Sequence, residues 1–123
     1  MKGEAMENIV NQQEFEAAQA ESATAKPSYT HMFSPPFQYG GKTYEKAAFD
    51  FAKLKGKDYL SIQDEMRANN KYAITPSLSS DFLVLMCAKA SGIGDDILSE
   101  LPIADFSQII TKARSFLLKT ELG

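Results

Sequence analysis

The chain has little of the residue chemistry on which most catalytic and metal sites are built. Its 123 residues include one Cys, one His and no Trp. A single Cys excludes an intramolecular disulfide and a cysteine-based zinc site. A single His excludes a multi-histidine metal site, although it still leaves room for one Ser or Cys nucleophile. We therefore expect no metal, no cofactor and no enzymatic activity.

The chain also lacks an excess of positive charge. It carries 13 basic and 16 acidic residues, for a net charge of −3. Residues 1–26 contain five glutamates and two lysines, which accounts for the whole of that charge, and residues 27–123 are formally neutral. A protein that binds nucleic acid through its phosphates needs a basic face. We therefore expect no nucleic-acid partner.

Long apolar runs are missing as well. The longest, Phe82–Ala88, is far too short to span a bilayer. The first residues do not show a basic region followed by an apolar stretch of signal-peptide length. We therefore expect no membrane contact and a cytosolic protein, in which the single Cys87 stays reduced.

Residues 1–26 form a distinct acidic segment rich in Glu, Gln and Ala. Apart from its Met residues, its sizeable apolar side chains are Ile9, Val10 and Phe15. This is too little to define a core, and an isolated helix of this length is marginal in water. We expect a mobile arm with a nascent helix from about Met6 to Ala20. It is either a solvated tail or a small docking stripe for a partner or a sister subunit.

The next segment reads as an aromatic β-hairpin. Residues 29–33 alternate in the period of a half-buried strand. Pro35-Pro36 should interrupt the pairing, because proline has no backbone donor. Gly40-Gly41 suits a two-residue hairpin turn, which requires positive φ values. The second strand should run through Lys42–Tyr44 and continue over Ala47–Phe51, pairing back with the first.

From residue 58 onward the apolar period becomes helical. The sequence predicts a small antiparallel β-hairpin or meander packed on a bundle of three to four α-helices, an α+β fold in a single domain over residues 27–123. The expected helices run from an Asp58 cap to Asn69, from a Ser77 or Ser79 cap to Ser91 with Gly92 as terminator, from Asp95 to Leu101, and from an Asp105 cap over Phe106–Lys119.

Other candidate chemistry has simpler explanations. His31 lies in a strand-like alternation, so we interpret it as a packing or surface histidine. Cys87 sits mid-helix among apolar residues and should be a small core side chain. Helix capping accounts for Asp95-Asp96, and a solvated face accounts for Asp64-Glu65. Ser91–Gly94 lacks the further glycine and Lys-Ser/Thr of a phosphate loop, and is interpreted as a helix terminator.

The aromatic content of the hairpin exceeds what one sheet face needs. Sheet packing on the helices accounts for part of it, and the rest indicates a protein-binding face or a self-association surface. We expect Phe37, Tyr39 and Tyr44 to contribute to that face. The candidate partner-binding residues are Phe33, Phe37, Tyr39, Tyr44, Phe49 and Phe51.

The order of these motifs resembles the phage tail assembly chaperones. Residues 33–44 resemble the opening hairpin of that family, with a Pro-Phe, an aromatic, a Gly-Lys and a Tyr. Residues 50–60 are similar to a Leu-x-Gly-x-Asp element that opens a helix. Residues 88–92 and 101–106, closing on Phe116-Leu117, look like the family's C-terminal half. The resemblance covers roughly residues 28–118, and the acidic arm has no counterpart in it.

The resemblance implies a non-catalytic chaperone of a bacteriophage or prophage. Such proteins act in the host bacterial cytoplasm and are absent from the mature virion. They bind the tape measure protein and keep it soluble while the tail tube assembles. The major tail tube protein is a second candidate partner, and a homo-oligomer is a further possibility. The alternative function is a minor virion component, such as a tail completion or connector protein.

Overall fold

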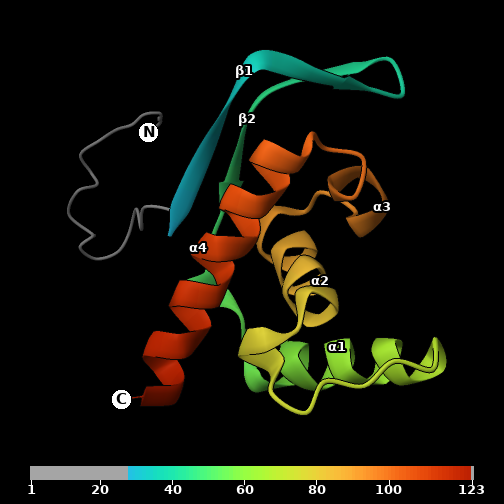
Figure 1. The fold of residues 1–123 in the computed structure, drawn as a ribbon, viewed down its shortest axis with the longest axis vertical. Helices are drawn as coiled ribbons and strands as arrows, with labels where there is room; N and C mark the ends of the chain where they lie inside the picture. The colour runs from blue at the N-terminus through green and yellow to red at the C-terminus, as the bar shows by residue number, and fades with distance from the viewer. Residues whose placement is uncertain (1–27, 123) are drawn as a thin grey trace, which may run out of the picture.

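A computed structural model describes residues 28–122, and the arm expected over residues 1–26 lies outside this range. The described chain is an antiparallel β-hairpin followed by helices, so the expected α+β class is confirmed (Figure 1). Its elements are β1 (Tyr29–Tyr39), β2 (Lys42–Phe49), the 3-10 turn η1 (Phe51–Lys53), α1 (Gly56–Ala68), the 3-10 turn η2 (Pro76–Leu78), α2 (Ser80–Ser91), α3 (Asp95–Leu98) and α4 (Ile103–Leu122).

The hairpin follows the turn and proline signals of the sequence. Gly40 and Gly41 adopt φ values of +59° and +77°, the left-handed region that a tight hairpin turn needs. Pairing runs from the turn back to Tyr29 opposite Phe49. The register shifts between Met32 and Phe37, where the two prolines cannot donate to the ladder. Both features were predicted.

Helix α2 occupies the centre of the fold. Five of its residues are buried, and it packs against α1, α3, α4, β2 and both 3-10 turns. The Ser79 hydroxyl caps its start by accepting the Phe82 backbone N–H at 3.2 Å. Gly92 ends it in the left-handed conformation, with φ +78°. The predicted cap, terminator and central position are therefore confirmed.

The other elements cover α2 from several sides. In Figure 1, α1 lies across the end of the molecule opposite the hairpin turn, and α4 runs alongside β1 and α2. The N–H of Asp50, just after β2, donates to the Ala90 carbonyl of α2 at 3.1 Å. The buried residues that α1 and α4 contribute are Ile62 and Met66 from α1, and Ile109, Ile110, Ala113 and Leu117 from α4.

Two helices begin earlier than the predicted caps. Helix α1 starts at Gly56. The Asp58 carboxylate accepts the Lys55 N–H at 2.7 Å, so Asp58 caps the helix from within its first turn and is not the residue before it. Helix α4 starts at Ile103. There the Pro102 carbonyl accepts the Phe106 N–H at 2.9 Å, so that Asp105 is already helical.

Three of the six aromatic residues expected at a partner face are instead in the core. The exposed fractions of Phe33, Phe49 and Phe51 are 6%, 0% and 2%. The end of β2 and η1 pack against α2, and the Phe51 ring lies 5.5 Å from that of Phe116 on α4. These side chains hold the hairpin on the helices, so they do not form an exposed aromatic face on the hairpin.

We expect Phe49→Ala to lower the free energy of unfolding by about 3–5 kcal/mol, because it opens a cavity at a fully buried site. Tyr39→Ala is the matched control from the same aromatic set. Its side chain is partly exposed, so the loss should be about 1 kcal/mol. Urea unfolding followed by circular dichroism measures both values. Equal losses would contradict the assignment of Phe49 to the core.

Candidate protein-binding groove

The remaining hairpin aromatics form a small cluster near the turn. Phe37 and Tyr44 face each other across the strands and are half-buried, with ring centroids 6.1 Å apart. Tyr39 stacks on Phe37 at 6.3 Å. The Lys42 ammonium lies 5.3 Å from the Tyr44 ring centroid. These rings pack largely on one another, so Tyr39 is the most exposed aromatic contact point that they present.

A larger apolar surface lies at the opposite end of the molecule. Helices α1, α2 and α4 and the η1 turn surround an open groove with a volume of about 560 Å³. Its floor consists of side chains that are themselves fully buried in the core: Phe51, Ile62 and Phe82. Its walls include Tyr59 and Leu60 from α1, and Phe116 from α4. The sequence prediction did not identify this groove.

The α1 wall supplies the most accessible apolar groups of the groove. Leu60 is 61% exposed and Tyr59 is 36% exposed. The Tyr59 ring also lies 5.0 Å from the Phe82 ring, so it connects the wall to the floor. Exposed apolar side chains above a preformed apolar floor are characteristic of surfaces that accept an amphipathic helix.

Three lysines give one border of the groove a positive charge. Lys55 lines the groove, and Lys53 and Lys57 flank it as exposed side chains. Among residues 28–122, the ion pairs join His31 to Asp105, Arg67 to Asp64 and Lys71 to Asp81, so none of the three lysines has a carboxylate partner.

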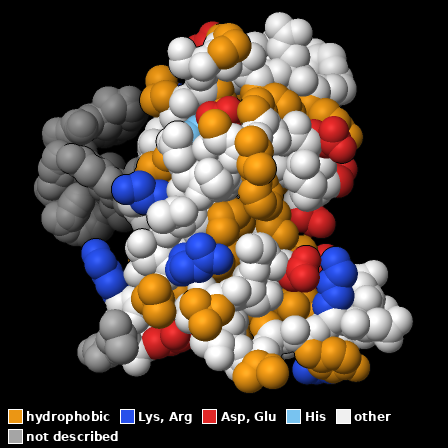
Figure 2. All heavy atoms as spheres, viewed as in Figure 1, with side chains coloured by type: hydrophobic (Ala, Val, Ile, Leu, Met, Phe, Trp, Pro, Cys, Tyr) orange, Lys and Arg blue, Asp and Glu red, His pale blue; other side chains and the backbone are white. Residues whose placement is uncertain are grey.

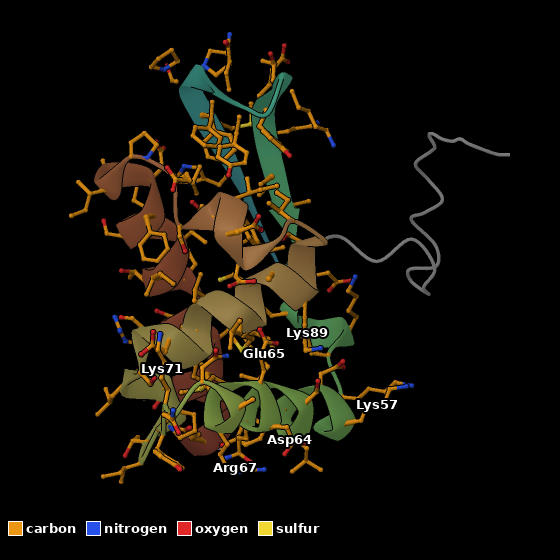
Figure 3. The ribbon with its side chains drawn as sticks, turned by 90° about the vertical axis from the view of Figure 1, so that its right-hand side faces the viewer. Lys57, Asp64, Glu65, Arg67, Lys71 and Lys89 are labelled. Carbon is orange, nitrogen blue, oxygen red and sulfur yellow. The ribbon has the colours of Figure 1, made fainter. Side chains whose placement is uncertain are left out.

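The acidic residue lining the groove, Asp58, is itself engaged by the Lys55 backbone N–H. Figure 3 shows Lys57 extending away from the start of α1, whereas Asp64 and Arg67 lie close together farther along that helix. Within residues 28–122, the three lysines of this border have no ion-pair partner and outnumber the one carboxylate that lines the groove.

A second exposed apolar set lies in the connection between α1 and α2. Tyr72, Ile74 and Leu78 are all largely exposed, and Ile74 completely so. Figure 2 shows hydrophobic side chains along the lower edge of the molecule, where this connection runs. None of the three lines the large groove, which makes Ile74 a useful reference position for experiments on it.

His31 is buried and bridges the sheet to α4. Its Nε2 lies 2.7 Å from the Asp105 carboxylate, and its Nδ1 lies 2.6 Å from the Tyr29 hydroxyl. In the neutral ring, Nε2–H donates to Asp105 and Nδ1 accepts the Tyr29 proton, which satisfies all three groups. Burial, with the negative charge of Asp105 as a second cause, raises the pKa of Tyr29. Because His31 is buried and both of its ring nitrogens are engaged, we interpret this set as a packing device.

Among the described residues, no group of three or more His, Cys, Asp or Glu side chains is placed to hold a metal ion. Over the same part of the chain, no helix has the length and apolar character needed to cross a bilayer. The Cys87 thiol is fully buried in α2. Burial raises its pKa to about 12, which suppresses its nucleophilicity.

Only a weak signal for the groove is present in the sequence. In the sequence, Tyr59, Ile62 and Met66 recur at the helical spacing i, i+3 and i+7, and Leu60 falls beside that stripe. Leu60, an apolar residue outside the core-facing stripe, was the one available sign of an exposed apolar surface on α1. It could not reveal the opposing wall, because Phe116 on α4 is more than 50 residues away.

No family model matches the sequence, and comparisons with curated proteins and with solved structures gave no significant match.

We expect the Cys87 thiol to make stability depend on pH in the alkaline range. Burial raises its pKa from an ordinary value of 9.0 to about 12, so the stability that its neutral form contributes is complete below pH 9 and is lost as the pH rises toward 12. Relative to Cys87→Ala, wild type should lose about 1.4 kcal/mol between about pH 8 and about pH 10. Urea unfolding at both pH values measures this, and a constant difference would refute it.

Proposed function

We propose that this protein is a non-catalytic phage tail assembly chaperone that binds the tape measure protein and keeps it soluble while the tail tube assembles. The observation that carries the proposal is the open apolar groove, with Leu60 exposed on its wall above a floor of core side chains. A soluble protein rarely leaves such a surface uncovered unless another molecule binds there.

The groove suits the apolar face of a helix. Buried floor residues such as Phe82 hold its shape, so little conformational entropy is lost on binding. Leu60 and Tyr59 are placed to pack against residues spaced one helical turn apart on the partner. Burial of one leucine-sized side chain contributes about 1.5–3 kcal/mol. Binding of this kind lowers the free concentration of an aggregation-prone chain by mass action.

The identity of the partner rests on the motif resemblance over residues 28–118. That resemblance implies a long, largely helical tape measure protein with apolar stretches, made in the host bacterial cytoplasm. The groove supports this choice by offering an apolar surface of the kind that such a helix needs. The major tail tube protein and a second copy of this chain would compete for the same contact surfaces.

We expect Leu60→Asp to weaken partner binding at least about tenfold, because it removes an apolar contact and places a charge in a desolvated interface. Co-expression with the tape measure protein, followed by measurement of its soluble fraction and by pull-down, tests this. Ile74→Asp is the matched control, since Ile74 is equally aliphatic but lies outside the groove. Circular dichroism checks that both variants remain folded.

The same assay separates the groove from the hairpin cluster. A folded Tyr39→Ser/Tyr44→Ser variant that loses binding, while Leu60→Asp keeps it, would move the partner site to the hairpin end. Unchanged binding by all variants would contradict both sites. Recovery of the protein in purified particles at a fixed stoichiometry would instead favour a minor virion component.

A further inference from the structure

We propose that the acidic N-terminal segment of this chain, residues 1–27, docks in the groove of its own molecule when no partner is bound. The docking itself does not depend on the identity of the partner. Its consequence, that the segment competes with a partner helix and sets a threshold for binding, rests on the proposed function. The structure supports this choice of occupant through the path of the chain, its reach and its charge.

The described chain begins at the border of the groove. The Ser28 hydroxyl accepts a hydrogen bond from the Ala52 backbone N–H at 3.3 Å. Ala52 lines the groove, next to the floor residue Phe51. The 27 residues that precede Ser28 therefore join the body of the molecule at this border, and not at the distant hairpin turn.

The segment is long enough to cover the groove. A helix over the predicted range Met6–Ala20 would be about 22 Å long. Residues 21–27 would connect it to Ser28 with an extended reach of about 24 Å. A tether this short raises the local concentration of the segment at its own groove to the millimolar range. That concentration favours the segment of the same chain over a second copy at ordinary protein concentrations.

The segment also complements the groove chemically. In the predicted helix, Met6, Ile9 and Val10 have the i, i+3, i+4 spacing that places them on one face. That face matches the apolar floor and walls. Residues 1–26 carry a net charge of −3, and the lysine border, Lys53, Lys55 and Lys57, has no carboxylate partner within the described chain.

Paramagnetic relaxation in the full-length chain tests the docking. A nitroxide is attached to an Ala18→Cys variant, where position 18 lies off the Met6–Val10 face. The native Cys87 is buried and does not compete for the label. We expect the amide signals of Ala52, Gly56 and Thr120, which line the groove, to lose most of their intensity. The signals of Gly40 and Gly41 at the hairpin turn should be unchanged.

A matched pair of variants shows whether the apolar face is responsible. Ile9→Asp/Val10→Asp in the labelled chain should raise the groove signals well above those of the labelled parent chain, because only the tether then keeps the nitroxide near Ala52. Asn11→Asp/Gln12→Asp adds the same two charges to neighbouring residues outside that face, and should leave the broadening in place. Equal effects of the two pairs would overturn the role of the apolar face.

The remaining outcomes are also decisive. A mixture of isotope-labelled chain without nitroxide and unlabelled chain with nitroxide reports contacts between molecules. The comparison is with the chain that carries both the isotope label and the nitroxide. If Ala52, Gly56 and Thr120 were broadened as strongly in the mixture as in that chain, the groove would be occupied by the segment of a second copy. No broadening in either sample would overturn the proposal. Because no partner protein is present, these results are independent of whether the tape measure protein binds.

Discussion

Burial of α2 is the constraint on which the rest of this structure depends. The helix is apolar on nearly all sides, and a helix of this kind is stable in water only when other elements bury most of it. The described chain meets this need with every other helix, the second strand and both 3-10 turns. Phe49 and Phe51 belong to that cover, which explains why an aromatic hairpin gives so many of its rings to the core.

The same requirement creates the groove. Figure 1 shows α1 lying across the direction of α4, and two helices that cross steeply can touch only near one point. The space between them lies above the first turns of α2, where Phe82 and Met86 form part of its lining. Covering α2 with short elements therefore leaves an apolar opening at one end, and the exposed Leu60 extends that opening to the surface.

Positively charged side chains lie along one border of this apolar opening. Lysines gather where η1 leads into α1, and the described chain supplies no carboxylate to pair with them. The net negative charge of the chain resides in residues 1–26, and the chain enters the fold at the border of the groove through Ser28. In the proposed docking, the groove, its lysine border and the acidic segment would meet in one place. The segment would then compete with a partner for the groove.

Local signals in the sequence determined much of the fold. Two adjacent glycines produced the hairpin turn, two prolines broke its pairing, Ser79 and Gly92 bounded the central helix, and apolar periodicity placed α1 and α4. The tertiary structure decided what depends on contacts between distant residues. It placed Phe33, Phe49 and Phe51 in the core. It brought Asp105 within hydrogen-bond distance of His31, which lies 74 residues away in the sequence. It also brought Leu60 and Phe116 to opposite walls of one groove. Turn and cap preferences act within a few residues, whereas burial and concavity depend on how whole elements pack.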